Sequence, residues 1–164
     1  MPSHTMELPR QIVVGEKNID SVGSFLNSLK KTKKISLVSG SNVKKIVQKK
    51  IEASLIASKI KCYWYLAKTN DQKTIQDIEK KVRQSKSELV IGIGGGRSVD
   101  IAKLIGFNLN KPFVSIPTSA SHDGIASPFV SVKGDKPHSL VATAPLGVFV
   151  DVDIIKKAPK RLLA

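Results

Sequence analysis

Short apolar runs alternate with amphipathic segments along the chain. The runs are rich in β-branched residues and have the length of buried strands. Strands are expected at Gln11–Val14, Ile35–Val38, Tyr63–Leu66, Leu89–Ile93, Pro112–Ile116, Phe129–Val132 and Gly147–Asp151. Between them, apolar residues recur at helical spacing. Helices are expected from Asn18 or Asp20 to Leu29, from Ser41 or Asn42 to about Leu55, from Asp71 to about Ser85, and from the glycines near 95 to about Asn108.

This alternation of strands and helices indicates the fold class. It is typical of an α/β domain with a Rossmann-like, mostly parallel sheet that is flanked by helices. A turn at 133–135, after the strand that begins at Phe129, adds a small β-hairpin. We expect an irregular tail over residues 1–9, the α/β domain over 10–158, and the first turn of a further helix over 159–164.

The charge balance raises the question of a nucleic-acid partner, because 27 Lys and Arg outnumber 13 Asp and Glu to give a net charge of +14. The lysines are spread over several predicted elements, however, and aromatic residues make up only 5% of the chain. No stacking platform for bases is indicated. A solvated basic surface is the favoured interpretation, and such a surface also attracts anionic small molecules.

The chain shows no sign of a membrane or secretory segment. No apolar run has the length of a bilayer span, and the N-terminus lacks the apolar core of a signal peptide. Cys62 is the single cysteine, so no intrachain disulfide can form. We therefore expect a protein of the reducing cytoplasm, with no membrane partner.

The most distinctive local feature is the glycine turn at Gly94, Gly95 and Gly96, between a predicted strand and a predicted helix. Without Cβ atoms, the backbone N–H groups can approach a ligand closely, and Ser98 is placed to cap the helix. A helix N-terminus of this kind binds phosphate or pyrophosphate. The spacing is neither that of GxGxxG nor that of a P-loop, and a tight turn made only for packing stays an equal alternative.

A second polar segment, the loop 117–128, follows the next predicted strand and is rich in hydroxyl groups. In a parallel sheet both segments lie beyond the carboxyl ends of strands, where ligands bind, so we expect them to face one crevice. Turn chemistry alone is the competing interpretation of the hydroxyls. Asp123 could bind a polyol hydroxyl or stabilise the turn before Gly124.

Three further carboxylates allow two interpretations each. Asp100, expected in the first helical turn after the glycines, either interacts with the helix dipole or borders a nucleotide pocket. Asp151 and Asp153 follow a strand and could bind a metal, but without a nearby histidine they are better explained as caps of the next helix.

The segments IGIGGGRSVDIAK, PFVSIPTSASHDGIASPFVSV and APKRLLA together resemble the archaeal-type glycerol-1-phosphate dehydrogenases. That family belongs to the group of glycerol dehydrogenases, iron-dependent alcohol dehydrogenases and dehydroquinate synthases. The resemblance covers essentially the whole chain, and the segment TSASHDGIAS is more typical of the glycerol-1-phosphate branch. It implies NAD(P)H-dependent reduction of dihydroxyacetone phosphate to sn-glycerol 1-phosphate, a step in making ether-lipid backbones.

The resemblance also assigns site residues. Asp123 is implied to contact the substrate. The residues implied to bind the cofactor are Gly94, Gly95, Gly96, Arg97, Ser98, Val99, Asp100, Thr118, Ser119, Ala120, Ser121 and Ser127. No Asp or Glu follows the second predicted strand at Ser39, where a carboxylate would repel a 2′-phosphate. We therefore expect NADPH to be tolerated.

Members of the family are about twice as long, and the resemblance places the catalytic Zn²⁺ and its Asp and two His ligands in their second half. None of the three ligands is expected in this chain, which we interpret as the N-terminal cofactor half of a two-domain enzyme, inactive alone. Apolar surface that would pack on the other half favours self-association, so a homo-oligomer is one expectation. The alternatives are a glycerol or other alcohol dehydrogenase of the same group, and a non-catalytic basic module that binds nucleotide or nucleic acid.

Overall fold

A six-stranded parallel sheet organises the molecule. The computed structural model describes residues 7–120, 125–132 and 138–160. The sheet has the order β1-β8-β5-β4-β2-β3. Its strands are β1 (Gln11–Gly15), β2 (Lys34–Ser39), β3 (Lys61–Leu66), β4 (Leu89–Gly94), β5 (Phe113–Pro117) and β8 (Gly147–Asp151). The predicted Rossmann-like fold class is therefore confirmed.

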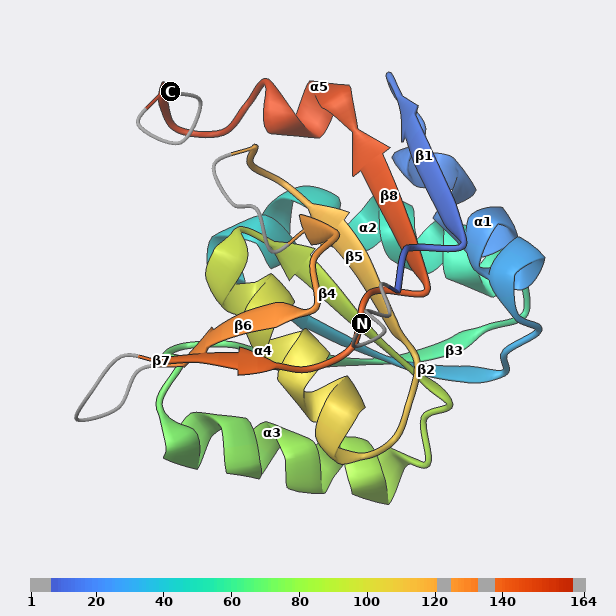
Figure 1. The fold of residues 1–164 in the computed structure, drawn as a ribbon. Helices are drawn as coiled ribbons and strands as arrows, with labels where there is room; N and C mark the ends of the chain where they lie inside the picture. Colours follow the sequence, from blue (N-terminus) through green and yellow to red (C-terminus); the bar gives the residue numbers. More distant parts are fainter. Residues whose placement is uncertain (1–6, 121–124, 133–137, 161–164) are drawn as a thin grey trace, which may run out of the picture.

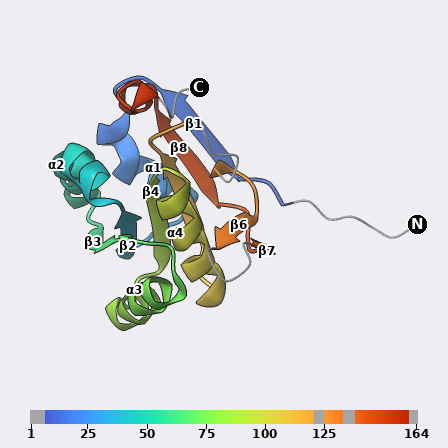
Figure 2. The ribbon, with the colours of Figure 1, turned by 90° about the vertical axis from the view of Figure 1, so that its left-hand side faces the viewer.

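Helices cover both faces of this sheet (Figures 1 and 2). They are the 3-10 turn η1 (Ile19–Ser21), α1 (Val22–Leu29), α2 (Ser41–Ala57), α3 (Gln72–Ser85), α4 (Gly96–Asn108) and the short α5 (Val152–Ile155). One core lies between α1, α2 and the strand residues Ile35, Leu37 and Ile91. A second core lies between α3, α4 and the opposite face, where Val38 and Val90 point. The period-2 alternation of side chains along a strand divides them between the two cores.

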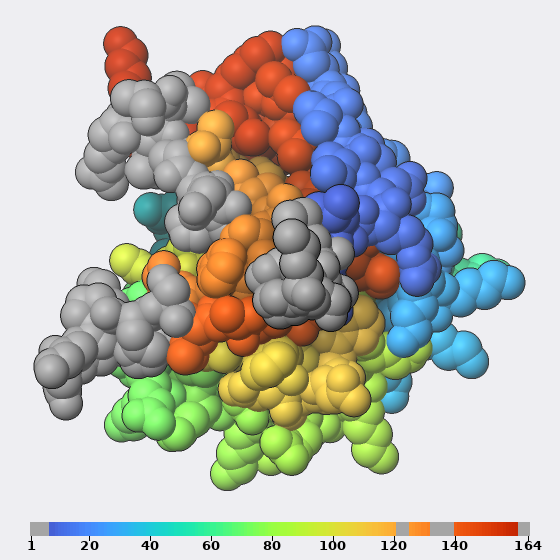
Figure 3. All heavy atoms as spheres, viewed as in Figure 1, coloured from blue at the N-terminus to red at the C-terminus, as the bar shows by residue number. Residues whose placement is uncertain are grey.

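The predicted hairpin is also present, as β6 (Phe129–Val132) paired antiparallel with β7 (His138–Val141). Figure 3 shows the hairpin, in orange and red, against the surface of α4, in yellow. The turn expected at 133–135 lies outside the described residues. In the part of the chain that the structure describes, no helix is long and apolar enough to cross a membrane.

Several expected helix caps are wrong. Gly40 and Gly95 are the N-caps of α2 and α4, and neither makes a side-chain cap bond. The caps predicted at Ser41, Asn42 and Ser98 are therefore not formed, because each helix starts at the residue directly after its glycine N-cap. Asp71, in contrast, caps α3 as predicted, since its carboxylate accepts a 2.8 Å hydrogen bond from the N–H of Thr74.

The start of the first helix differs for another reason. Neither Asn18 nor Asp20 caps it; η1 comes first, and Ser21 then precedes α1 without a side-chain cap bond. The amide of Asn18 donates instead to the carbonyl oxygen of Val150 at 3.1 Å. The first turn is thereby attached to β8.

Candidate functional site

The sheet reverses its winding between β2 and β4. These strands are hydrogen-bonded neighbours, yet α2 after β2 covers one face of the sheet and α4 after β4 covers the other. The two helices diverge from this point and leave an opening at the carboxyl ends of the strands, which is where α/β sheets of this type bind ligands. The glycine turn lies at this opening.

Gly94 and Gly95 shape the turn. Gly94 has φ +143°, a conformation that side chains rarely allow, and a Cβ there would lie 3.0 Å from Oγ of Ser98. Gly95, at the N-cap of α4, has an ordinary φ of −80°. A Cβ on Gly95 would meet only Oγ of Ser119, at 3.4 Å. Gly94 is thus required by the backbone, whereas the space beside Gly95 is open and faces the next loop.

The hydroxyl-rich loop starts directly beside this turn. Gly94 and Pro117 are register partners in β4 and β5, and the N–H of Thr118 donates to the carbonyl oxygen of Gly94 at 3.0 Å. Ser119 is buried with 3% of its surface exposed. The two segments expected to share a crevice are therefore adjacent.

A cavity of about 340 Å³ lies at this junction. Gly95, Thr118 and Ser119 form its polar side, and α2 and the segment after β8 form a mostly apolar side. The residues of those two walls are Asn42, Val43, Ile46, Val47, Ile154, Lys157, Ala158 and Pro159. Ile46 is 60% exposed, so this apolar side chain of α2 is available to the cavity. The cavity combines uncapped helix N–H groups with an apolar wall, which suits a ligand with both phosphate and ring portions.

A second cavity, of about 490 Å³, continues from the first on the other side of α2's first turn. It is lined by Gly40, Ser41, Asn42, Val43, Leu66, Ala67, Lys68 and Arg97. Arg97 crosses from α4 and donates to the carbonyl oxygen of Lys68 at 3.0 Å, with its side chain exposed. The lining contains two cations, Lys68 and Arg97, and no carboxylate.

Of the described residues that the resemblance assigned to the cofactor, four line a cavity and seven line neither, namely Gly94, Gly96, Ser98, Val99, Asp100, Ala120 and Ser127. Three of these seven are buried in α4. Ser98 is 5% exposed and lies beneath Gly94. Val99 packs in the core that contains α3 and α4. Asp100 is 4% exposed and lies beyond the first turn of α4, so the expected first-turn position is wrong. Its carboxylate accepts a 3.1 Å hydrogen bond from the N–H of Ser131 in β6.

The remaining predicted residues are distributed along the loop. Ala120 is exposed. Ser127 is half-buried, and its carbonyl oxygen accepts a 2.7 Å hydrogen bond from Lys103. Ser121 and Asp123 lie outside the described residues. The predicted roles of all four in binding stay predictions.

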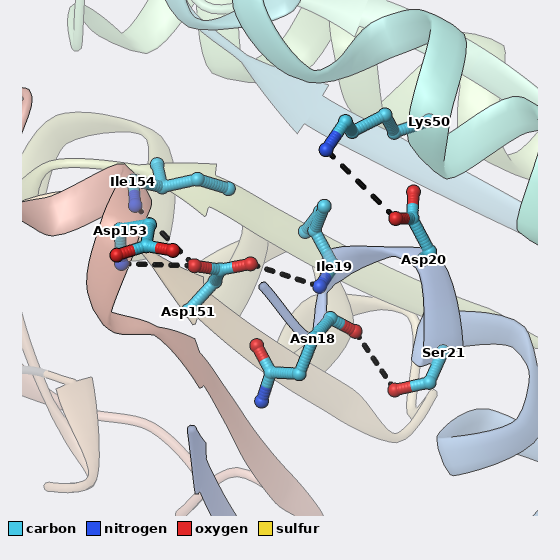
Figure 4. Close-up of polar contacts among 8 residues, drawn as sticks. All are labelled: Asn18, Ile19, Asp20, Ser21, Lys50, Asp151, Asp153 and Ile154. Atoms are coloured by element: carbon cyan, nitrogen blue, oxygen red, sulfur yellow. Dashed lines mark hydrogen bonds and ion pairs between the residues drawn. The ribbon is translucent and has the colours of Figure 1, made fainter. Parts of the chain in front are cut away.

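Asp151 acts as a cap, in agreement with the interpretation favoured from the sequence (Figure 4). One carboxylate oxygen accepts from the N–H groups of Asp153 and Ile154, which start α5, and the other accepts from the N–H of Ile19 at 2.9 Å. In the described ranges, no group of three His, Cys, Asp or Glu side chains could hold a metal ion. The described residues therefore do not fit a catalytic Zn²⁺.

Sequence reasoning missed the cavity wall and one buried charge. Lys157 and Ile154 line the main cavity, although they lie far along the chain from the glycines. Lys103 is completely buried. The sequence feature that could have indicated this burial is the position of the lysine within the apolar helical run IAKLIG.

Comparison with known proteins decides the family. The profile of the iron-containing alcohol dehydrogenases matches residues 13–159. The chain belongs to this family. Curated relatives named glycerol-1-phosphate dehydrogenase [NAD(P)+] are 66% identical in Nitrosopumilus maritimus and 59% identical in Cenarchaeum symbiosum, in each case over 100% of this chain and 46% of the relative. The chain thus spans about half the length of these relatives.

Solved structures agree at the level of the fold. Glycerol dehydrogenase from Schizosaccharomyces pombe superposes with a TM-score of 0.86 at 22% identity, over 99% of this chain and 42% of that one. The NADH-dependent butanol dehydrogenase A of Thermotoga maritima gives 0.87 at 17% identity, over 99% and 47% of the two chains. The α/β half of this family is therefore the structure described above.

Proposed function

We propose that this chain is the cofactor-binding half of a glycerol-1-phosphate dehydrogenase, which reduces dihydroxyacetone phosphate to sn-glycerol 1-phosphate with NADH or NADPH. The observation that carries the proposal is the shared cavity of Gly95, Thr118 and Ser119. The 66% identity with a relative of that name supports the choice of substrate within the family. The segment TSASHDGIAS supports it as well.

Within this proposal, each part of the opening binds a different part of the cofactor. The free N–H groups at the start of α4 receive the pyrophosphate beside Gly95, where the helix dipole favours negative charge. The cavity lined by Arg97 and Lys68 receives the adenosine ribose. A 2′-phosphate there meets two cations and no carboxylate, so both NADH and NADPH are accepted.

The bound nicotinamide supplies the hydride, and this chain's residues hold and orient it. We propose that the Zn²⁺ of the intact enzyme is bound by residues outside this chain, and that the 164-residue chain has cofactor affinity without turnover. A cytoplasmic location, predicted from the single free Cys62, is part of the same proposal.

The test uses the single tryptophan as a reporter. Trp64 lies within β3, and its indole N–H donates at 2.6 Å to Oγ of Ser39, the residue before Gly40 of the second cavity. Titration of the chain with NADH and NADPH is expected to change Trp64 fluorescence with comparable affinities. Gly95→Ala should weaken both by about ten-fold or more, because the new methyl group occupies the space proposed for the pyrophosphate.

Gly15→Ala is the matched control, since its Cβ would meet only the side chain of Asn18 and Gly15 lines neither cavity. It should bind both cofactors as the original chain does. Saturable binding that is unaffected by Gly95→Ala would refute the assigned site. Robust dihydroxyacetone phosphate reduction by the 164-residue chain would refute the proposal that it is a cofactor-binding half without turnover of its own. A longer form that oxidises glycerol but not sn-glycerol 1-phosphate would favour the glycerol dehydrogenase alternative.

A further inference from the structure

Lys103 is a charged residue of α4 that is completely buried, with 0% of its surface exposed. Its ammonium group donates to the carbonyl oxygen of Ser127 at 2.7 Å and to that of Phe129 at 2.8 Å. Burial of an ammonium group is costly unless it is hydrogen-bonded. By donating to both carbonyl oxygens, Lys103 fixes the backbone of residues 127–129 to α4.

Asp100 contributes from the same helix, one turn earlier. Its carboxylate accepts from the N–H of Ser131 at 3.1 Å. Two buried charged side chains of α4 thus make three hydrogen bonds to the backbone between Ser127 and Ser131. This is the segment that returns from the hydroxyl-rich loop into β6, which Figure 2 shows beside α4.

The beginning of the loop is attached to the same unit. Thr118 N–H donates to the carbonyl oxygen of Gly94 at 3.0 Å, and Gly94 leads through the glycine turn into α4. The loop therefore leaves from the end of β5, beside the end of β4, and its returning end is hydrogen-bonded to Lys103 of α4. Both of its ends are fixed to the element that carries the glycine turn.

We propose that Lys103 is a positioning residue of the cofactor site, which sets the returning end of the hydroxyl-rich loop relative to the glycine turn. Lys103 lines neither cavity, so its effect on a ligand passes through the backbone it holds. Asp100 assists by fixing the first residues of the hairpin. The inference rests on the proposed function, because the ligand whose affinity depends on Lys103 is the nicotinamide cofactor.

The first test compares two lysines that both donate to a backbone carbonyl. Lys103→Met removes the ammonium group at similar volume and should weaken NADH binding by about ten-fold, since small displacements of contacting groups are costly in affinity. Lys111→Met is the matched control. Lys111 donates to the carbonyl oxygen of Ser87 before the start of β4, at the opposite end of the strand from the glycine turn. Its loss should leave NADH affinity within about two-fold.

Melting curves separate positioning from general stability. If Lys103→Met binds NADH as tightly as the original chain while it is folded at the assay temperature, the proposal is wrong. If it binds weakly while its melting midpoint matches that of Lys111→Met, the proposal is supported. Absence of NADH binding by the original chain would instead refute the proposed function, so the two failures are distinguishable.

Hydrogen exchange of the original chain keeps the proposal testable if Lys103→Met does not fold. The informative amides are those of Thr118 and Ser131, which bond to Gly94 and Asp100 respectively. With NADH at about ten times its Kd, both should exchange about ten-fold more slowly, because the two ends of the loop are held by one unit. Slower exchange at Thr118 with unchanged exchange at Ser131 would overturn the proposal.

Discussion

Replacing Asp151 by alanine should destabilise the chain more than the loss of any single surface carboxylate. The Asp151 carboxylate is 2% exposed and accepts hydrogen bonds from Ile19, Asp153 and Ile154 (Figure 4). It therefore joins η1, near the start of the chain, to α5, near its end. Asp151→Ala leaves the buried N–H of Ile19 without its acceptor and α5 without its cap.

The magnitude follows from these two losses. A hydrogen bond to a charged group contributes about 1.5–3 kcal/mol, and loss of a helix cap costs about 1 kcal/mol. The expected loss is therefore about 2.5–4 kcal/mol, or a decrease in Tm of about 5–16 °C for a chain of this size. Asp153→Ala removes a neighbouring, more exposed carboxylate that pairs with Lys156 at 3.6 Å, and should cost about 0.5 kcal/mol or less.

Urea unfolding, followed by Trp64 fluorescence and by far-ultraviolet circular dichroism, measures the free energy of unfolding of both variants. Asp151→Asn is an informative intermediate, because its amide keeps one acceptor oxygen but presents N–H groups to the other donors. The free energy of unfolding of Asp151→Asn should lie between those of the original chain and Asp151→Ala. Equal losses for Asp151→Ala and Asp153→Ala, or a loss below about 1 kcal/mol for Asp151→Ala, would refute the reasoning.

Two further predictions concern packing and pH. Gly92→Ala places a Cβ 2.9 Å from Cα of Val99, so α4 must shift away from β4. Calorimetry should show that the free energy of unfolding falls by about 1–3 kcal/mol. An unchanged Tm would contradict this close approach. The pKa of Asp71 lies below its ordinary value because the Thr69 hydroxyl and the Thr74 N–H donate to its carboxylate. The stability that Asp71 contributes is therefore present above the pKa of its unfolded form, and it is lost as the pH falls through the lower pKa of the folded form. Asp71→Ala should thus lower Tm at pH 7 and have little effect on Tm in strong acid. Equal effects at both pH values would exclude this linkage.

Much of the fold could be predicted because burial follows the hydrophobic pattern. Phe25, Leu26 and Leu29 recur at helical spacing and lie in the core, and the β-branched run around Ile91 is a central strand. Helix starts were harder to predict. Side-chain caps are local preferences worth about 1 kcal/mol, and at Gly40 and Gly95 the path of the chain out of the sheet determined the first helical residue instead.

The candidate site was predictable only in part, for a related reason. The glycine turn and Thr118 follow neighbouring strands, so their proximity could be inferred from the parallel sheet. Lys157 and Ile46 reach the cavity through tertiary packing, to which no local spacing corresponds. Asp100 shows the converse case, since a residue within the proposed ligand-binding motif is buried and accepts a hydrogen bond from the hairpin.

The reversal of winding between β2 and β4 has a consequence for how this family diverges. An opening produced by the route of the backbone persists while most side chains are exchanged, provided that the strand order is kept. This agrees with the fold that this chain shares with the glycerol dehydrogenase of Schizosaccharomyces pombe at only 22% identity. Natural variation can then alter the walls of such an opening, and with them the molecules it admits, without rebuilding the scaffold beneath.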